Sequence, residues 1–198
     1  MISVLDNTRS KRVLVVAHPA DETLYCAGLL QRYPGDWSIV ACSQPRKGGM
    51  MALKFLLACR ALNARGCVLG NTEASQIVPL ELDQIEFDEV DLIVTHGPHG
   101  EFGDMHHKQV HDRVRSIAPS GVEVLTIGYG RFSTEKPPLT FELTDKEWNG
   151  KLNALHAYNT DMCCDGVMMP EWEMLLERYG TPGRNHGFDL RIESYDRA

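Results

Sequence analysis

The chain has 198 residues, of which 43% are hydrophobic, and a formal net charge of −7 at pH 7. This length and apolar content suffice for one sizeable core, so we expect a single domain over residues 1–198. The acidic balance, without a basic cluster, argues against nucleic acid as a partner. No apolar run approaches the roughly 20 residues that span a bilayer.

The cysteines and the first residues favour the cytoplasm. Six cysteines are dispersed without a C-x-x-C pair, several of them in apolar surroundings, where a reduced thiol behaves as a small hydrophobe. The first six residues lack the basic and apolar regions of a signal peptide. We therefore expect a reduced, cytoplasmic protein. The oligomeric state stays open, with a homo-oligomer among the alternatives.

Apolar runs and helical periodicity alternate along the chain. In chain order, the predicted strands cover residues 12–17, 37–42, 67–69, 90–95 and 122–128, and the predicted helices cover residues 23–33, 50–64, 108–116 and 145–158. Strands that alternate with helices favour a parallel sheet. The sequence therefore predicts an α/β fold, with a mainly parallel sheet and helices on both faces.

The first predicted strand runs directly into the segment His-Pro-Ala-Asp-Glu at residues 18–22. Pro19 ends the strand, which leaves His18, Asp21 and Glu22 on a loop at its carboxyl end. Open α/β sheets bind their ligands at this edge. A second histidine-rich loop, at residues 95–107, also follows an apolar run. Two such strand-end loops predict a metal site assembled across a parallel sheet.

Together the two loops resemble the zinc-dependent N-acetylglucosaminyl deacetylases of the LmbE-like / PIG-L family. The family motif A-H-P-D-D-E is matched by A-H-P-A-D-E at residues 17–22, and its G-H-x-x-H element by G-D-M-H-H at residues 103–107. The last predicted helix, with Lys151, Leu155 and Tyr158, resembles the family's K-x-x-A-x-x-x-Y helix. The resemblance spans about residues 10–160. It implies a Rossmann-like, three-layer α/β fold, which agrees with the alternation of strands and helices.

The resemblance implies that His18, Asp21 and His107 bind zinc (Zn²⁺). Imidazole and carboxylate suit this ion, and three protein ligands leave one position open for water. Another divalent transition metal would also fit this donor set. The implied activity is a metal-dependent hydrolase that removes an acetyl group from an N-acetylated amino sugar or glycoconjugate. Zinc would activate water against the acetamide carbonyl.

Ala20 occupies the position of the family's general base, the first Asp of A-H-P-D-D-E. Alanine cannot accept a proton, and loss of a general base typically costs about 10²–10⁴ in rate. Three explanations stay open: an engineered inactive variant, a natural sugar-binding pseudoenzyme that keeps the metal, or another group acting as base. Glu22 and Asp104 are the candidate carboxylates for this alternative base, although Glu22 is better suited to orienting a metal ligand through a hydrogen bond.

Asp104 is the second departure, because it replaces the first His of G-H-x-x-H. In the family this His stabilises the oxyanion or protonates the leaving amine. An ionised carboxylate would repel a developing oxyanion. We therefore expect His106 to contact the substrate instead, with His96 and His99 as alternatives from the same loop.

The third departure concerns the sugar. Family members often carry R-x-x-E at the start of the second helix, where this chain has Met51 and Lys54. Arg46 or Lys47, in the preceding loop, is the expected replacement for the sugar-binding Arg. Tyr129 follows the predicted strand 122–128 and is a further candidate for lining the substrate pocket.

Overall fold

The computed structural model of the chain describes residues 3–44, 49–72, 85, 87, 89–128, 139–158 and 190–197. The strands are β1 (Lys11–Val16), β2 (Asp36–Gln44), β3 (Arg65–Thr72), β4 (Leu92–Thr95), β5 (Glu123–Ile127), β6 (Leu139–Glu142) and β7 (Ile192–Arg197). The helices are α1 (Ser3–Asp6), α2 (Asp21–Arg32), α3 (Gly49–Ala61), α4 (Met105–Ile117) and α5 (Asp145–His156), with a 3₁₀ turn, η2 (Glu101–Gly103).

The strands form one seven-stranded sheet in the order β3-β2-β1-β4-β5-β7-β6. All neighbours from β3 to β5 pair in parallel, whereas β7 is antiparallel to both β5 and β6. The prediction of a mainly parallel α/β sheet is confirmed. Neither β6 nor β7 was predicted, because their short sequences, LTFE and IESYDR, lack an apolar run.

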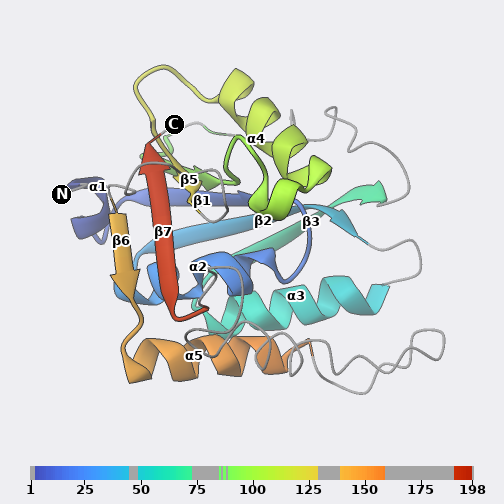
Figure 1. Cartoon of the computed structure of the whole chain (residues 1–198), viewed down its shortest axis with the longest axis vertical. Helices are drawn as coiled ribbons and strands as arrows, with labels where there is room; N and C mark the ends of the chain where they lie inside the picture. The colour runs from blue at the N-terminus through green and yellow to red at the C-terminus, as the bar shows by residue number, and fades with distance from the viewer. Residues whose placement is uncertain are drawn as a thin grey trace.

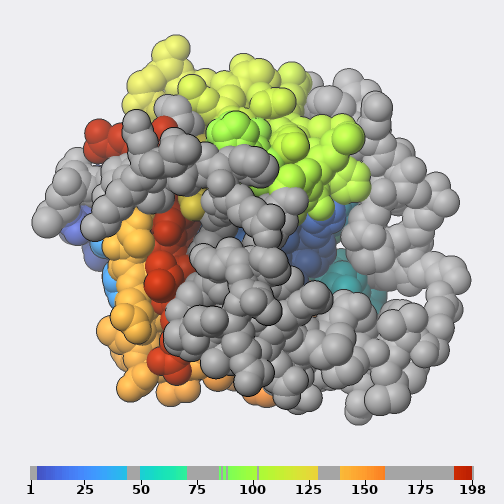
Figure 2. Space-filling view, in the orientation of Figure 1, coloured from blue at the N-terminus to red at the C-terminus, as the bar shows by residue number. Residues whose placement is uncertain are grey.

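Helices cover both faces of the sheet, which gives three layers (Figure 1). Alternate residues of β1 face opposite sides: Leu14 and Val16 belong to the core beneath α2, α3 and α5, and Val13 and Val15 to the core beneath α4. Strands β6 and β7 form the left side of the surface seen in Figure 2, and α4 forms the top.

The strand order changes direction between β1 and β4. From β1 the chain proceeds outward through β2 and β3, and it then returns to β4 and continues to β5 on the other side. The loops that leave the carboxyl ends of β1 and β4 therefore diverge to opposite faces. This switch point is where open α/β sheets form a crevice for ligands, and both histidine-containing loops start there.

The antiparallel strand β7 is tied to α2 by hydrogen bonds inside the helix. Glu193 accepts from the backbone N–H groups of Gly28 and Leu29, both at 2.8 Å, and the Tyr195 hydroxyl donates to the Tyr25 carbonyl at 2.8 Å. Lys151 of α5 lies 3.1 Å from Glu193, and both side chains are fully buried. Because α2 begins at the loop that carries His18, strand β7 helps to position that loop.

Among the described residues, no helix is both long enough and apolar enough to cross a membrane.

Candidate metal centre

The loop between β1 and α2 is held in an uncommon conformation. Ala20 lies in the left-handed region, with φ 88° and ψ −23°, which costs a residue with a Cβ roughly 1–2 kcal/mol. Its N–H donates to Glu22 Oε2 at 2.9 Å and to the Tyr158 hydroxyl at 3.1 Å. The turn lets the backbone N–H of His18 donate to Asp21 Oδ2 at 2.8 Å. His18 and the first residue of α2 are thereby brought side by side.

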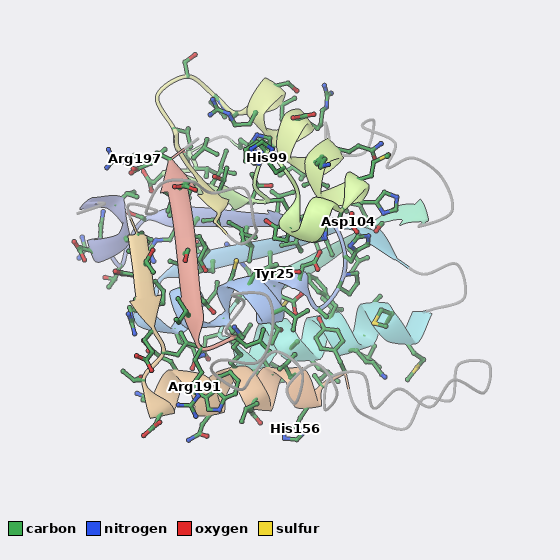
Figure 3. All side chains as sticks on the ribbon, viewed as in Figure 1. Tyr25, His99, Asp104, His156, Arg191 and Arg197 are labelled. Atoms are coloured by element: carbon green, nitrogen blue, oxygen red, sulfur yellow. The ribbon has the colours of Figure 1, made fainter. Side chains whose placement is uncertain are left out.

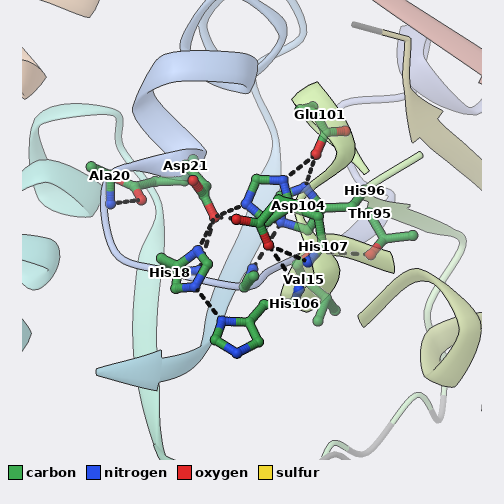
Figure 4. Close-up of polar contacts among 12 residues, drawn as sticks. Val15, His18, Ala20, Asp21, Thr95, His96, Glu101, Asp104, His106 and His107 are labelled. Carbon is green, nitrogen blue, oxygen red and sulfur yellow. Dashed lines mark hydrogen bonds and ion pairs between the residues drawn. The ribbon is translucent and has the colours of Figure 1, made fainter. Parts of the chain in front are cut away.

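His18, Asp21 and His107 converge on one point (Figure 4). His18 Nδ1 and His107 Nε2 each lie 3.4 Å from Asp21 Oδ2, and the three ligand atoms lie within 4.8 Å of one another. The centroids of the His18 and His107 rings are 5.4 Å apart. Residues 89 positions apart in the sequence thus meet at the switch point, as the sequence analysis predicted.

The donor types, and two of the distances between them, suit a divalent metal ion such as zinc. Zinc bonds of about 2.0–2.1 Å to nitrogen and oxygen imply about 3.3–3.4 Å between neighbouring ligand atoms of a tetrahedron. The two N···O distances of 3.4 Å match this edge. The side chains of Asp21 and His107 are 10% and 5% exposed, whereas that of His18 is 20% exposed. The cluster is therefore reached from the His18 side.

Electrostatics link these three residues before any cation is present. Burial lowers the pKa of His107, but Asp21 and Glu101 outweigh it and raise this pKa to about 10. Burial raises the pKa of Asp21, but the neighbouring imidazoles of His107, His18 and His96 bring it well below its usual value. A carboxylate that stays ionised among imidazoles is a competent cation ligand.

Helix α4 begins at Met105 rather than at the predicted residue 108. Asp104 is its N-cap, and Oδ1 accepts from the backbone N–H groups of His106 and His107 at 2.7 and 3.2 Å. His106 and His107 consequently belong to the first turn of a helix and not to a loop. Figure 3 shows Asp104 at this end of α4. The capping contact gives Asp104 a definite local role, and its role in catalysis stays a prediction.

His106 lies against His18, with Nδ1 of His106 3.0 Å from Nε2 of His18. If His18 presents Nδ1 to a metal, its Nε2 carries the remaining proton and donates a hydrogen bond to His106 Nδ1. In that case His106 orients His18, the most exposed of the three residues. Whether it also contacts substrate stays a prediction.

Glu22 lies behind the loop. It is fully buried, and Oε1 accepts from the hydroxyls of Thr23 and Tyr158, both at 2.6 Å. Burial raises the pKa of Glu22 to about 7, although the hydroxyls of Thr23 and Tyr158 oppose this rise. The contacts with the Ala20 N–H and with Tyr158 make Glu22 a support for the turn at residue 20; its catalytic role stays a prediction.

Some predicted substrate contacts lie outside the described residues, namely Arg46 and Tyr129. Of the residues at the family's R-x-x-E positions, Lys54 is buried and its Nζ donates to the Tyr158 carbonyl at 2.8 Å. Lys54 thus links α3 to the end of α5 and supports the residue that contacts Ala20.

The sequence analysis assigned no role to Glu101 and gave His96 only a secondary one. Both are buried next to His107, and one Glu101 oxygen lies 2.5 Å from Nδ1 of each histidine. The carboxylate also accepts from the Gly97 N–H at 3.1 Å. Burial raises the pKa of Glu101, but the two histidines bring it down to about 2. The sequence did contain one indication of Glu101: its carboxylate lies in the same predicted strand-end loop as the candidate ligand His107.

Among the comparisons with known proteins, only the solved structures give matches, and they bear on the fold. No protein-family model matches the chain, and no curated protein matches it. The A40926 pseudoaglycone deacetylase has a similar solved structure, with a TM-score of 0.63 and 13% identity over 94% of this chain and 96% of that one.

Two further structures come from teicoplanin biosynthesis. A triple mutant of its deacetylase gives a TM-score of 0.62 at 12% identity, over 96% of this chain and 99% of that one. The zinc-inhibited form of teicoplanin deacetylase gives 0.60 at 12% identity, over 95% and 99%. This chain has the fold of those deacetylases.

Proposed function

We propose that this protein is a metal-dependent hydrolase that removes acetyl groups from N-acetylated amino sugars or sugar conjugates. The observation that carries the proposal is the convergence of His18 Nδ1, Asp21 Oδ2 and His107 Nε2 at the switch point of the sheet. The similar structures bear the names of deacetylases, which supports the same class of reaction. We propose that residues 1–198 form one domain for this activity.

In this proposal His18, Asp21 and His107 hold Zn²⁺. When bound, zinc lowers the pKa of water and polarises an amide carbonyl. Glu101 and His106 orient the two imidazole ligands, while Glu22 and Tyr158 hold the turn that carries Asp21. His106, Arg46 and Tyr129 are the proposed substrate contacts.

Ala20 sets the rate that we expect. Its methyl group cannot accept a proton, so deacetylation by the chain as it stands is slow unless another carboxylate serves as base. Asp104 is the leading substitute, because Oδ1 serves as the helix cap and leaves the second carboxylate oxygen for this role. His107 and His18 help to hold the pKa of Asp104 below its usual value, against the effect of burial.

A non-catalytic sugar-binding protein that retains the metal is the second candidate. The same alanine favours it, because the ligand cluster is intact whereas the base position is empty of proton acceptors. The two candidates share the metal and the sugar and differ only in turnover.

The test is metal content and acetate release. Purified protein, freed of metal with a chelator and reloaded with zinc, is expected to bind one ion per chain. It should release acetate from a panel of N-acetylated amino sugars only when reloaded. His107→Ala should lose most of the bound metal, whereas His156→Ala, at an exposed position on α5 (Figure 3), should not. Unchanged metal content in His107→Ala would remove His107 from the ligand set.

A further inference from the structure

A second group of potential ligands lies beside the first. His96, Glu101 and His107 are all buried, and they too offer ligand atoms within 4.8 Å of one another. His107 belongs to both groups. The hydrogen bonds of the second group decide what it does.

The proton on His96 is placed by the backbone. The N–H of Ala17, at the end of β1, can only donate, and it lies 2.8 Å from His96 Nε2. Asp21 Oδ2 lies further from the same nitrogen, at 3.5 Å, so the shorter contact with the Ala17 N–H decides that His96 Nε2 carries a lone pair and no proton. A neutral imidazole has its proton on the other nitrogen, so His96 Nδ1 donates to Glu101 Oε2 at 2.5 Å. Both His96 nitrogens are used within the protein, and neither is left for a metal.

Glu101 is fixed from three sides. Its Oε1 accepts from the Gly97 N–H at 3.1 Å, and its Oε2 accepts from Nδ1 of both His96 and His107. Gly100, with φ +63°, allows the tight turn before it, since a Cβ there would lie 2.3 Å from the Asp104 carbonyl oxygen. The carboxylate thus has only donors around it in the described contacts.

The His107 ring is fixed as well. It stacks on His96 with centroids 3.8 Å apart and planes inclined by 18°, and Tyr25 packs edge-on against both rings. Because Glu101 accepts from Nδ1, His107 must keep a proton there. Its Nε2 is then the nitrogen that faces Asp21.

We infer that Glu101 is a positioning residue that sets the tautomer and orientation of His107, and that His96 anchors Glu101 without ligating the metal. This inference rests on the proposed metal site. Such carboxylate–histidine–metal arrangements typically contribute 10–100-fold to metal affinity. The His96–Glu101 pair accordingly strengthens zinc binding through His107 alone.

Glu101→Gln tests the inference by removing the acceptor at nearly constant shape. The amide cannot accept from both imidazoles and also from the Gly97 N–H, because one end of it carries only donors. We expect the zinc dissociation constant to rise by about 10–100-fold. The matched control is Asp112→Asn, an exposed carboxylate on α4, the helix that carries His107, which should leave the dissociation constant unchanged.

Two further readouts separate positioning from general destabilisation. In nitrogen-15 NMR of the zinc-loaded wild type, the His107 proton should reside on Nδ1. Unfolding of the metal-free variants gives their stability independently of the metal. His96→Phe keeps the stacked ring but removes both nitrogens of His96. Because we infer that His96 is not a ligand, this variant should still bind one zinc ion, and more tightly than His107→Ala does.

The outcomes are distinct. A wild-type dissociation constant in Glu101→Gln, or a His107 proton on Nε2 in the loaded protein, would overturn the inference and leave the proposed function standing. Complete loss of zinc in a folded His96→Phe variant would make His96 a ligand and would also overturn it. A wild-type protein that binds no zinc would overturn the proposed function, and this inference with it.

Discussion

The Tyr158 hydroxyl donates to Glu22 Oε1 at 2.6 Å, and it also accepts from the backbone N–H of Ala20 at 3.1 Å. Tyr158, two residues beyond the end of α5, thus supports the strained turn that precedes α2. Tyr158→Phe should lower the free energy of unfolding by about 1–3 kcal/mol, since a buried carboxylate loses a donor. Urea denaturation measures this change.

A double-mutant cycle assigns the loss to the contact itself. If Tyr158 acts through Glu22, combining Tyr158→Phe with Glu22→Gln should give a coupling energy above about 0.5 kcal/mol. Strict additivity of the two changes would show that the hydroxyl acts elsewhere.

Ala20→Gly should stabilise the protein. The left-handed φ of 88° costs alanine roughly 1–2 kcal/mol, which exceeds the roughly 0.4–1 kcal/mol that the flexible glycine costs through the unfolded state. We expect a net gain of up to about 1.6 kcal/mol. Ala52→Gly, at a half-exposed position within α3, should instead destabilise by about 0.5–1 kcal/mol. Equal losses from both substitutions would contradict the strain at residue 20.

Ala20→Asp should raise the rate of acetate release by at least about 10²-fold, because it restores a proton acceptor at the expected base position. Asparagine also tolerates the left-handed conformation, so Ala20→Asn controls for relief of backbone strain and should gain little. Brisk turnover by the unmodified chain would point to another base. Asp104→Asn then becomes decisive, because asparagine still caps α4 but accepts no proton.

The stability of the metal-free protein should fall between about pH 4.5 and 7 through Glu22. Its pKa is raised to about 7 in the folded state, so folding takes up a proton in this range and the favourable contribution disappears as the pH rises through 7. The expected loss is on the order of 3 kcal/mol. Urea denaturation in chelator at several pH values measures the slope, and Glu22→Gln should abolish this part of it.

Glu101 acts in the opposite direction at lower pH. Its pKa is lowered to about 2, so its contribution is complete above the ordinary value of 4.5 and is lost as the pH falls toward 2. The His107 contribution, with a pKa raised to about 10, is present below 6.5 and is lost toward pH 10. Glu101→Gln should therefore flatten the acid limb and leave the Glu22 window in place.

Lys151→Met should destabilise the protein by about 3–5 kcal/mol, because it leaves the Glu193 carboxylate buried without its cation. Adding Glu193→Gln should recover part of this loss. The exposed pair of Arg65 and Asp36 is the control, and Arg65→Gln should change the urea midpoint little. A small effect of Lys151→Met would show that the backbone donors of Gly28 and Leu29 satisfy Glu193 alone.

The sequence by itself determined the layers of the fold and the place of the site. Alternating apolar runs and helical periodicity are local patterns, and they predicted the parallel strands from β1 to β5 and the helices between them. The segment from His18 to Asp21 follows β1 directly, so its position at the carboxyl edge follows from the strand alone. Aspartate is a common helix N-cap residue. That Asp104 caps α4 became clear only once the structure showed that the helix starts at Met105.

Only the tertiary structure decided which distant groups meet. The order of strands puts β1 beside β4, and this pairing brings His18 to His107 and lets the Ala17 N–H reach His96. No local pattern encodes a hydrogen bond between residues 79 positions apart. The hydrogen bonds from the α2 backbone to Glu193 of β7 were not predicted for the same reason. Its partners come from separate elements, and burial of a charge is favourable only once all of them are in place.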